Sequence, residues 1–125
     1  MTTLSNGIRV CTESWPSSIS SVGCFIGSGS REETLETSGS AHFLEHLMFK
    51  GTSNRTRVQL EKEVENLGAQ LNAYTSREFT VYHMNAFNND VSKAVEILGD
   101  MIQNSRFDKQ AIEVEREVIL SLIHI

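Results

Sequence analysis

The stretch that most constrains the fold is residues 41–51, an apolar segment carrying three polar side chains at one repeated spacing. His42, Glu45 and His46 are three and four residues apart, so on an α-helix they emerge on one face. The apolar residues between them are predicted to face a core: Phe43, Leu44 and Leu47. The segment therefore predicts a helix that packs on one side and presents a polar cluster on the other.

The polar cluster has the composition of a catalytic zinc site. Two imidazoles one helical turn apart can bind one metal ion, and zinc takes neutral histidine nitrogens readily. A catalytic site keeps one position for water, whose pKa the metal lowers to about 7. Glu45, if it is not a ligand, can accept a proton from this water and pass it to a leaving amine. The pattern His-x-x-Glu-His is the inverted zincin signature.

Two alternatives remain open for this cluster. The same donors could hold manganese or cobalt in place of zinc. The helix could also be a buried structural one, with both histidines bonded to nearby backbone carbonyls and Glu45 in solvent. The spacing of the three polar groups on one helical face favours the metal site.

Length and composition limit the class of protein. The 125 residues suit one domain, and no apolar run is long enough to cross a bilayer. Eleven Lys and Arg against sixteen Asp and Glu give a net charge of -5, and the basic residues are dispersed, which argues against a nucleic-acid partner. Cys11 and Cys24 lack Cys-x-x-Cys spacing, so we expect buried thiols on strands.

Hydrophobic periodicity along the chain predicts an α+β fold. Two alternating segments joined at residues 76–78 predict a β-hairpin. The predicted helix that carries His42, Glu45 and His46 is called the metal helix below. Ser38 or Ser40 is its predicted N-cap. Thr56 and Gln59 form a capping box before the next helix, whose charged face we interpret as solvated. Residues 2–13 are predicted to form a strand pair or one kinked strand, broken at Asn6-Gly7. The other predicted strands are 20–27, 70–76 and 78–87, and the predicted helices are 38–51, 56–68, 89–105 and 108 onward.

Four segments in order carry a family resemblance: 42–46 (HFLEH), 49–52 (FKGT), 71–78 (LNAYTSRE) and 111–120 (AIEVEREVIL). Together they resemble the mitochondrial processing group of the pitrilysin-like zinc endopeptidases, over residues 2–120. The resemblance implies an antiparallel or mixed β-sheet with helices packed on it, Zn2+ as cofactor, and an α subunit as partner. It also implies presequence peptides as substrates and a mitochondrial location, in the matrix or at the inner membrane, although no presequence is recognised within the chain.

Carried over residue by residue, the resemblance assigns roles at the metal helix and on one strand. His42 and His46 become zinc ligands, and Glu45 becomes the general base. A segment of the predicted hairpin becomes part of the strand that pairs with an extended substrate, as in strand addition. The substrate-binding residues implied in this way are Asn72, Ala73 and Tyr74.

The sequence departs from the family pattern at the third zinc ligand. The family has a glutamate where this chain has Leu122. Glu115 lies on the same helical face but about 10 Å away along the axis, and His124 is expected to face away. We therefore expect two ligands and weak zinc binding, and an inactive chain when it is alone. Residues 1–125 are expected to be the N-terminal part of a pitrilysin-like domain that is truncated.

Two functions follow from the resemblance. The first is a zinc metalloendopeptidase subunit, or a fragment of one, that removes presequences from imported mitochondrial proteins. The second is a structural core subunit of the cytochrome bc1 complex, ubiquinol-cytochrome c reductase, which resembles the peptidase in fold and has cytochrome bc1 subunits as partners. The complete set of His42, Glu45 and His46 favours the peptidase, whereas Leu122 favours the core subunit.

Overall fold

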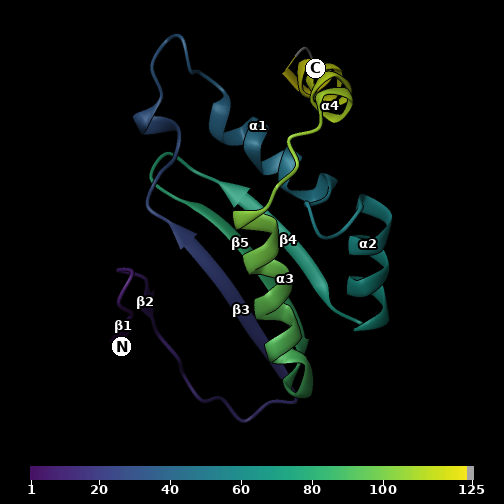
Figure 1. Ribbon diagram of the computed structural model, residues 1–125. Coiled ribbons are helices and arrows are strands. Elements are labelled where there is room, and N and C mark those ends of the chain that lie inside the picture. The colour runs from purple at the N-terminus through teal and green to yellow at the C-terminus, as the bar shows by residue number, and fades with distance from the viewer. Residues whose placement is uncertain (124–125) are drawn as a thin grey trace.

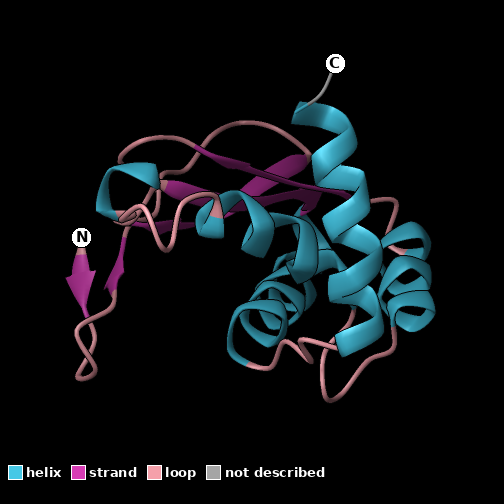
Figure 2. Cartoon of the chain, turned by 90° about the horizontal axis from the view of Figure 1, so that it is seen from above, coloured by secondary structure: helices cyan, strands magenta, loops and turns pink. Residues whose placement is uncertain are grey.

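The computed structural model describes residues 1–123, and it has an α+β architecture as the sequence predicts. A three-stranded antiparallel sheet has the order β3, β5, β4, so β5 is the central strand. The helices lie on one face of this sheet (Figure 1, Figure 2). The strands are β3 (Ile19–Ile26), β4 (Gln70–Thr75) and β5 (Thr80–Phe87), with a separate hairpin of β1 (Thr2–Thr3) and β2 (Arg9–Val10).

The sheet is contacted directly by α1, α2 and α3, and α4 packs on one of them. Helix α3 crosses β3 and β5, α1 contacts β4, and α4 packs on α1 (Figure 1). None of the helices within residues 1–123 is long and apolar enough to cross a membrane. The helices are α1 (Ser40–Leu47), α2 (Arg57–Asn66), α3 (Val91–Gln103) and α4 (Lys109–Ile123), with 3-10 turns η1 (Ser30–Glu32), η2 (Met48–Lys50) and η3 (Asn88–Asp90).

The core forms between β5 and the helices because β5 alternates apolar side chains toward them. Met84 and Ile97 are fully buried at the contact between β5 and α3. Leu60 joins the same cluster from α2, and Met48 joins it from the turn after α1. The remaining buried members are Tyr82, Ala86, Ala94, Leu98 and Met101. Helix α1, the predicted metal helix, is therefore held at the margin of a packed core.

Some local expectations are wrong. Leu44 was expected in the core but is 39% exposed, whereas Leu47 is buried. Cys11 follows the short strand β2 and is exposed, while Cys24 lies on β3 and is half-buried. The strand pair predicted within residues 2–13 does form around Asn6-Gly7, but its strands are short, because an isolated two-strand ribbon contributes little burial. The longer periodic segments keep the predicted type.

Candidate metal centre

The metal helix begins differently from the prediction. Its N-cap is Gly39, whose φ of 87° lies in the left-handed region, and Ser40 is the first helical residue. Among residues 1–123, no serine side chain caps this end; the backbone N–H groups of Gly39 and Ala41 donate to the two carboxylate oxygens of Glu33, at 2.7 and 2.9 Å. The Ala41 and Gly39 bonds lower the pKa of the Glu33 carboxyl. A carboxylate from the preceding loop thus caps the helix that carries the motif.

His42 and His46 converge as the spacing predicts. Their Nε2 atoms are 3.1 Å apart, and their rings meet edge to face. Two nitrogens bound to one tetrahedral zinc at about 2.05 Å are separated by about 3.3 Å. The two imidazoles therefore already have the spacing that a shared metal ion requires.

Glu45 is on the same helix and faces β4. Thr75 at the end of β4 donates its hydroxyl to Glu45 Oε2 at 2.6 Å. The side chain is half-buried, so the plainer interpretation that leaves Glu45 in bulk solvent does not describe it. The hydroxyl bond fixes one carboxylate oxygen and holds the Glu45 face of the helix toward the strand.

Glu115 on α4 has a role that the sequence did not indicate. Its Oε2 lies 3.0 Å from His46 Nδ1 and its Oε1 lies 2.6 Å from Lys50 Nζ, and the residue is only 5% exposed. Burial raises the pKa of the Glu115 carboxyl, but the bonds from Lys50 and His46 outweigh it and leave the pKa lowered. Glu115 thus contacts the ring nitrogen opposite Nε2 and orients the His46 ring from that side.

The described residues do not complete a metal site. Within residues 1–123, no group of three or more His, Cys, Asp or Glu side chains is arranged to hold a metal ion. Leu122 on α4 is 51% exposed, and His124 lies outside the described residues. The paired imidazoles fit two zinc ligands in spacing and in donor chemistry. The third position is supplied by no described side chain.

The three residues implied in substrate pairing lie on β4, an edge strand of the described sheet. Ala73 is partly buried against the core, while Tyr74 is 50% exposed on the opposite face. Asn72 Oδ1 accepts a hydrogen bond from the Ala73 N–H at 2.9 Å. A peptide that paired with this strand through Ala73 N–H has to displace that contact. Whether a peptide binds there stays a prediction.

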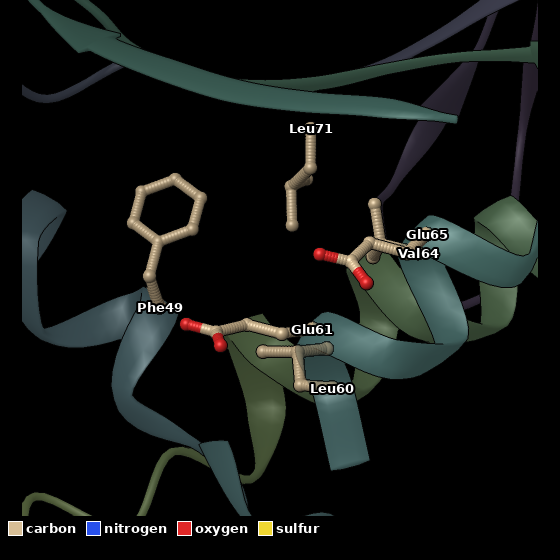
Figure 3. Close-up of a pocket in the computed structure, with 6 residues that line it drawn as sticks. All are labelled: Phe49, Leu60, Glu61, Val64, Glu65 and Leu71. Carbon is tan, nitrogen blue, oxygen red and sulfur yellow. The ribbon is translucent and has the colours of Figure 1, made fainter. Parts of the chain in front are cut away.

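A pocket of about 260 Å³ lies between η2, α2 and β4. One of its lining residues, Phe49, follows His46 by three positions in the sequence. Figure 3 shows the carboxylate of Glu65 pointing into the middle of the pocket and that of Glu61 lying at its rim, on the side of Phe49. The charged face of α2 is exposed, as we expected, but these two residues also line a concave surface. The lining residues are Phe49, Leu60, Glu61, Val64, Glu65 and Leu71.

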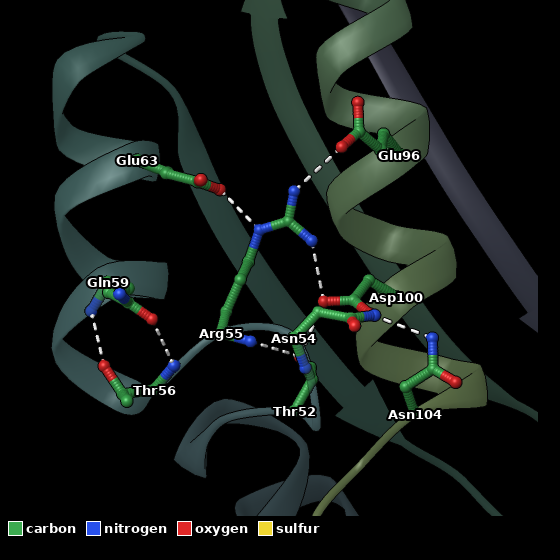
Figure 4. Close-up of polar contacts among 9 residues, drawn as sticks. All are labelled: Thr52, Asn54, Arg55, Thr56, Gln59, Glu63, Glu96, Asp100 and Asn104. Atoms are coloured by element: carbon green, nitrogen blue, oxygen red, sulfur yellow. Dashed lines mark hydrogen bonds and ion pairs between the residues drawn. The ribbon is translucent and has the colours of Figure 1, made fainter.

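A polar network anchors the loop between the metal helix and α2. Arg55 reaches three carboxylates on two helices, Glu63 at 2.6 Å, Asp100 at 2.7 Å and Glu96 at 2.9 Å (Figure 4). Burial lowers the pKa of the Arg55 guanidinium, but its bonds to Asp100, Glu63 and Glu96 leave the pKa raised. The predicted capping box at Thr56 follows directly and is confirmed.

Asp100 is the centre of this network. Its Oδ1 accepts from Asn54 and Asn104 at 2.8 and 2.9 Å, and its Oδ2 accepts from Thr52 and Arg55 at 2.6 and 2.7 Å (Figure 4). Burial raises the pKa of the Asp100 carboxyl, but these donors hold it well below its usual range. Sequence reasoning missed this group because a single Asp inside a helix carries no local signal of its partners.

The motif His-x-x-Glu-His, which α1 carries at residues 42–46, is the signature of the inverted-motif metallopeptidases. The profile of the family described as Insulinase (Peptidase family M16) matches residues 9–124. The chain belongs to this family.

Similar proteins agree with that membership. The chain is 59% identical to the mitochondrial-processing peptidase subunit beta of Neurospora crassa, over 95% of this chain and 25% of that protein. It is 54% identical to the rat subunit beta, over 96% of this chain and 24% of that protein. A protease from Helicobacter pylori aligns with TM-score 0.77 and 30% identity, over 82% of this chain and 25% of the other. The chain spans about a quarter of the length of the curated relatives it matches.

Proposed function

We propose that this chain carries the catalytic helix of a zinc metalloendopeptidase subunit that removes presequences from proteins imported into mitochondria. The observation that carries the proposal is the convergence of His42 and His46 Nε2, at 3.1 Å, beside Glu45 on one helix. Membership of the M16 family supports it. The Neurospora crassa and rat relatives are processing-peptidase subunits, which favours this function over a cytochrome bc1 core subunit.

Each residue of the proposed site has a distinct role. His42 and His46 would hold the metal through Nε2, and His46 would be oriented by Glu115 at Nδ1. When bound, zinc supplies the Lewis-acid chemistry that activates water and polarises the scissile carbonyl. Glu45 takes the proton of the attacking water at Oε1, while Thr75 holds Oε2, and then gives that proton to the leaving amine.

The proposed substrate is an extended peptide that adds to the edge of β4 at Asn72, Ala73 and Tyr74. The apolar pocket flanked by Glu61 and Glu65 supports a peptide with apolar and basic side chains. The proposed partner is the α subunit of the processing peptidase, in mitochondria. We further propose that the 125-residue chain binds zinc weakly and is inactive alone, because the third ligand position is Leu122.

Zinc affinity of the chain tests the metal assignment. Leu122→Glu is expected to tighten zinc binding by more than about tenfold, since even an outer-shell partner is worth about 10–100-fold. The matched control is Leu120→Glu, which adds the same carboxylate on α4 about 160° away around the helix. Equal affinities of the two variants contradict the third-ligand position. Absence of zinc binding in both, and in the parent, contradicts the metal site.

Activity is tested in a chimera. The chain with Leu122→Glu replaces the matching quarter of the Neurospora crassa subunit, which is then assembled with its α subunit. Cleavage of a presequence peptide is expected, and Glu45→Gln in the same chimera is expected to abolish cleavage while zinc stays bound. Undiminished cleavage by the Glu45→Gln chimera contradicts the assigned base.

A further inference from the structure

Lys50 lies in the turn η2, four residues after His46, and the sequence suggests only that it complements the helix dipole. The structure gives it a specific partner. Its Nζ is 2.6 Å from Glu115 Oε1, and the side chains are 18% and 6% exposed. A cation from the metal helix segment thus meets a buried carboxylate from α4.

Glu115 connects this cation to a proposed ligand. Its second oxygen, Oε2, lies 3.0 Å from His46 Nδ1. An ionised carboxylate only accepts hydrogen bonds, so Nδ1 must carry the proton in this contact. In the neutral ring, Nε2 is then left with its lone pair. That nitrogen is the one that lies 3.1 Å from His42 Nε2.

We infer that Lys50 is a positioning residue, which fixes Glu115 through Oε1 so that Oε2 holds His46 in the Nδ1–H tautomer with Nε2 presented for metal binding. The inference rests on the proposed metal site and extends it to a residue that does not touch the ligand. Because Glu115 is buried, removing Lys50 leaves one oxygen without its charged partner. The carboxylate is then free to turn toward solvent and away from His46.

Lys50→Met in the 125-residue chain tests this inference through two readouts. Nitrogen-15 NMR of the metal-free chain reports which nitrogen of His46 is protonated, and chelator competition reports the affinity for zinc. We expect Lys50→Met to shift His46 toward the Nε2–H tautomer and to weaken zinc binding about 10–100-fold, the usual effect of losing an outer-shell partner. Lys50→Arg keeps the cation and is expected to restore both properties. Arg57→Met, on an exposed ion pair, is the control and should change neither.

The outcomes separate this inference from the proposed function. A parent chain that binds no zinc counts against the metal site, but its His46 tautomer still tests Lys50. Retention of the Nδ1–H tautomer and of the parent affinity in Lys50→Met overturns the inference. If Lys50→Met does not fold, as judged by circular dichroism, Lys50→Gln keeps a hydrogen-bond donor without the charge and is read by the same two measurements.

Discussion

Replacement of Asp100 by Asn is the sharpest test of how the loop before α2 is held. All four contacts of the carboxylate are to donors, from Thr52, Asn54, Arg55 and Asn104. Asparagine has nearly the same shape but one acceptor and one NH2 group. If its NH2 points at Thr52 and Arg55 it faces two donors, and if it points at Asn54 and Asn104 both of those amides have to turn to accept from it. The substitution therefore removes the charge opposite Arg55, and with it the charge that strengthens all four bonds, without creating a cavity.

The cost follows from these contacts. Hydrogen bonds to a charged group are worth about 1.5–3 kcal/mol each and neutral ones about 0.5–1.5 kcal/mol, so loss of the charge from four bonds costs about 4–6 kcal/mol. Arg55 keeps Glu63 and Glu96, so its charge is not left unpaired. A typical domain has only about 5–15 kcal/mol of stability in total. Asp100→Asn is therefore expected to remove a large share of the free energy of unfolding.

Urea unfolding at pH 7, followed by circular dichroism, measures this loss. With a slope of about 1–3 kcal/mol per molar urea, the midpoint should fall by about 2 M. Glu61→Gln is the control, because Glu61 pairs with Arg57 four residues away on the exposed face of α2 and such pairs contribute about 0.3–0.5 kcal/mol. If the two variants lower the midpoint equally, the reasoning about the buried network is refuted.

Two further predictions concern pH. The pKa of Asp100 is lower in the folded chain than its unfolded value of about 3.9, so its stabilisation is present above that value and is lost as pH falls toward the folded pKa. The urea midpoint should therefore decrease as the pH is lowered below about 4, and it should decrease less steeply in Asp100→Asn. Equal slopes of midpoint against pH in the two proteins contradict this assignment. Burial, with smaller effects from Glu45 and Cys24, raises the pKa of Tyr82 to about 12. Its stabilisation is therefore present below about pH 10 and is lost as pH rises toward the folded pKa. A step of phenolate absorbance near pH 12 that is missing in Tyr82→Phe, which keeps only Tyr74, checks this value, and ionisation of both tyrosines by pH 10 in the folded chain contradicts it.

Local periodicity determined the elements of this protein. The three-and-four spacing of His42, Glu45 and His46 requires a helix for the groups to meet, and the structure brings the two imidazoles together as predicted. The alternating residues of β3 and β5 likewise appear on opposite faces of the sheet. The capping box of Thr56 and Gln59 formed because both partners lie within one turn. These features depend on residues close together in the chain.

The surroundings of the site were decided by tertiary structure alone. Glu115 reaches His46 across 69 positions of sequence, and Thr75 reaches Glu45 across 30. Arg55 meets Asp100 across 45 positions. No local pattern marks such partners, because their distance depends on how α1, α3, α4 and β4 pack together. The sequence by itself therefore determined which groups share a helix face, and packing determined which distant groups orient, anchor and bury them.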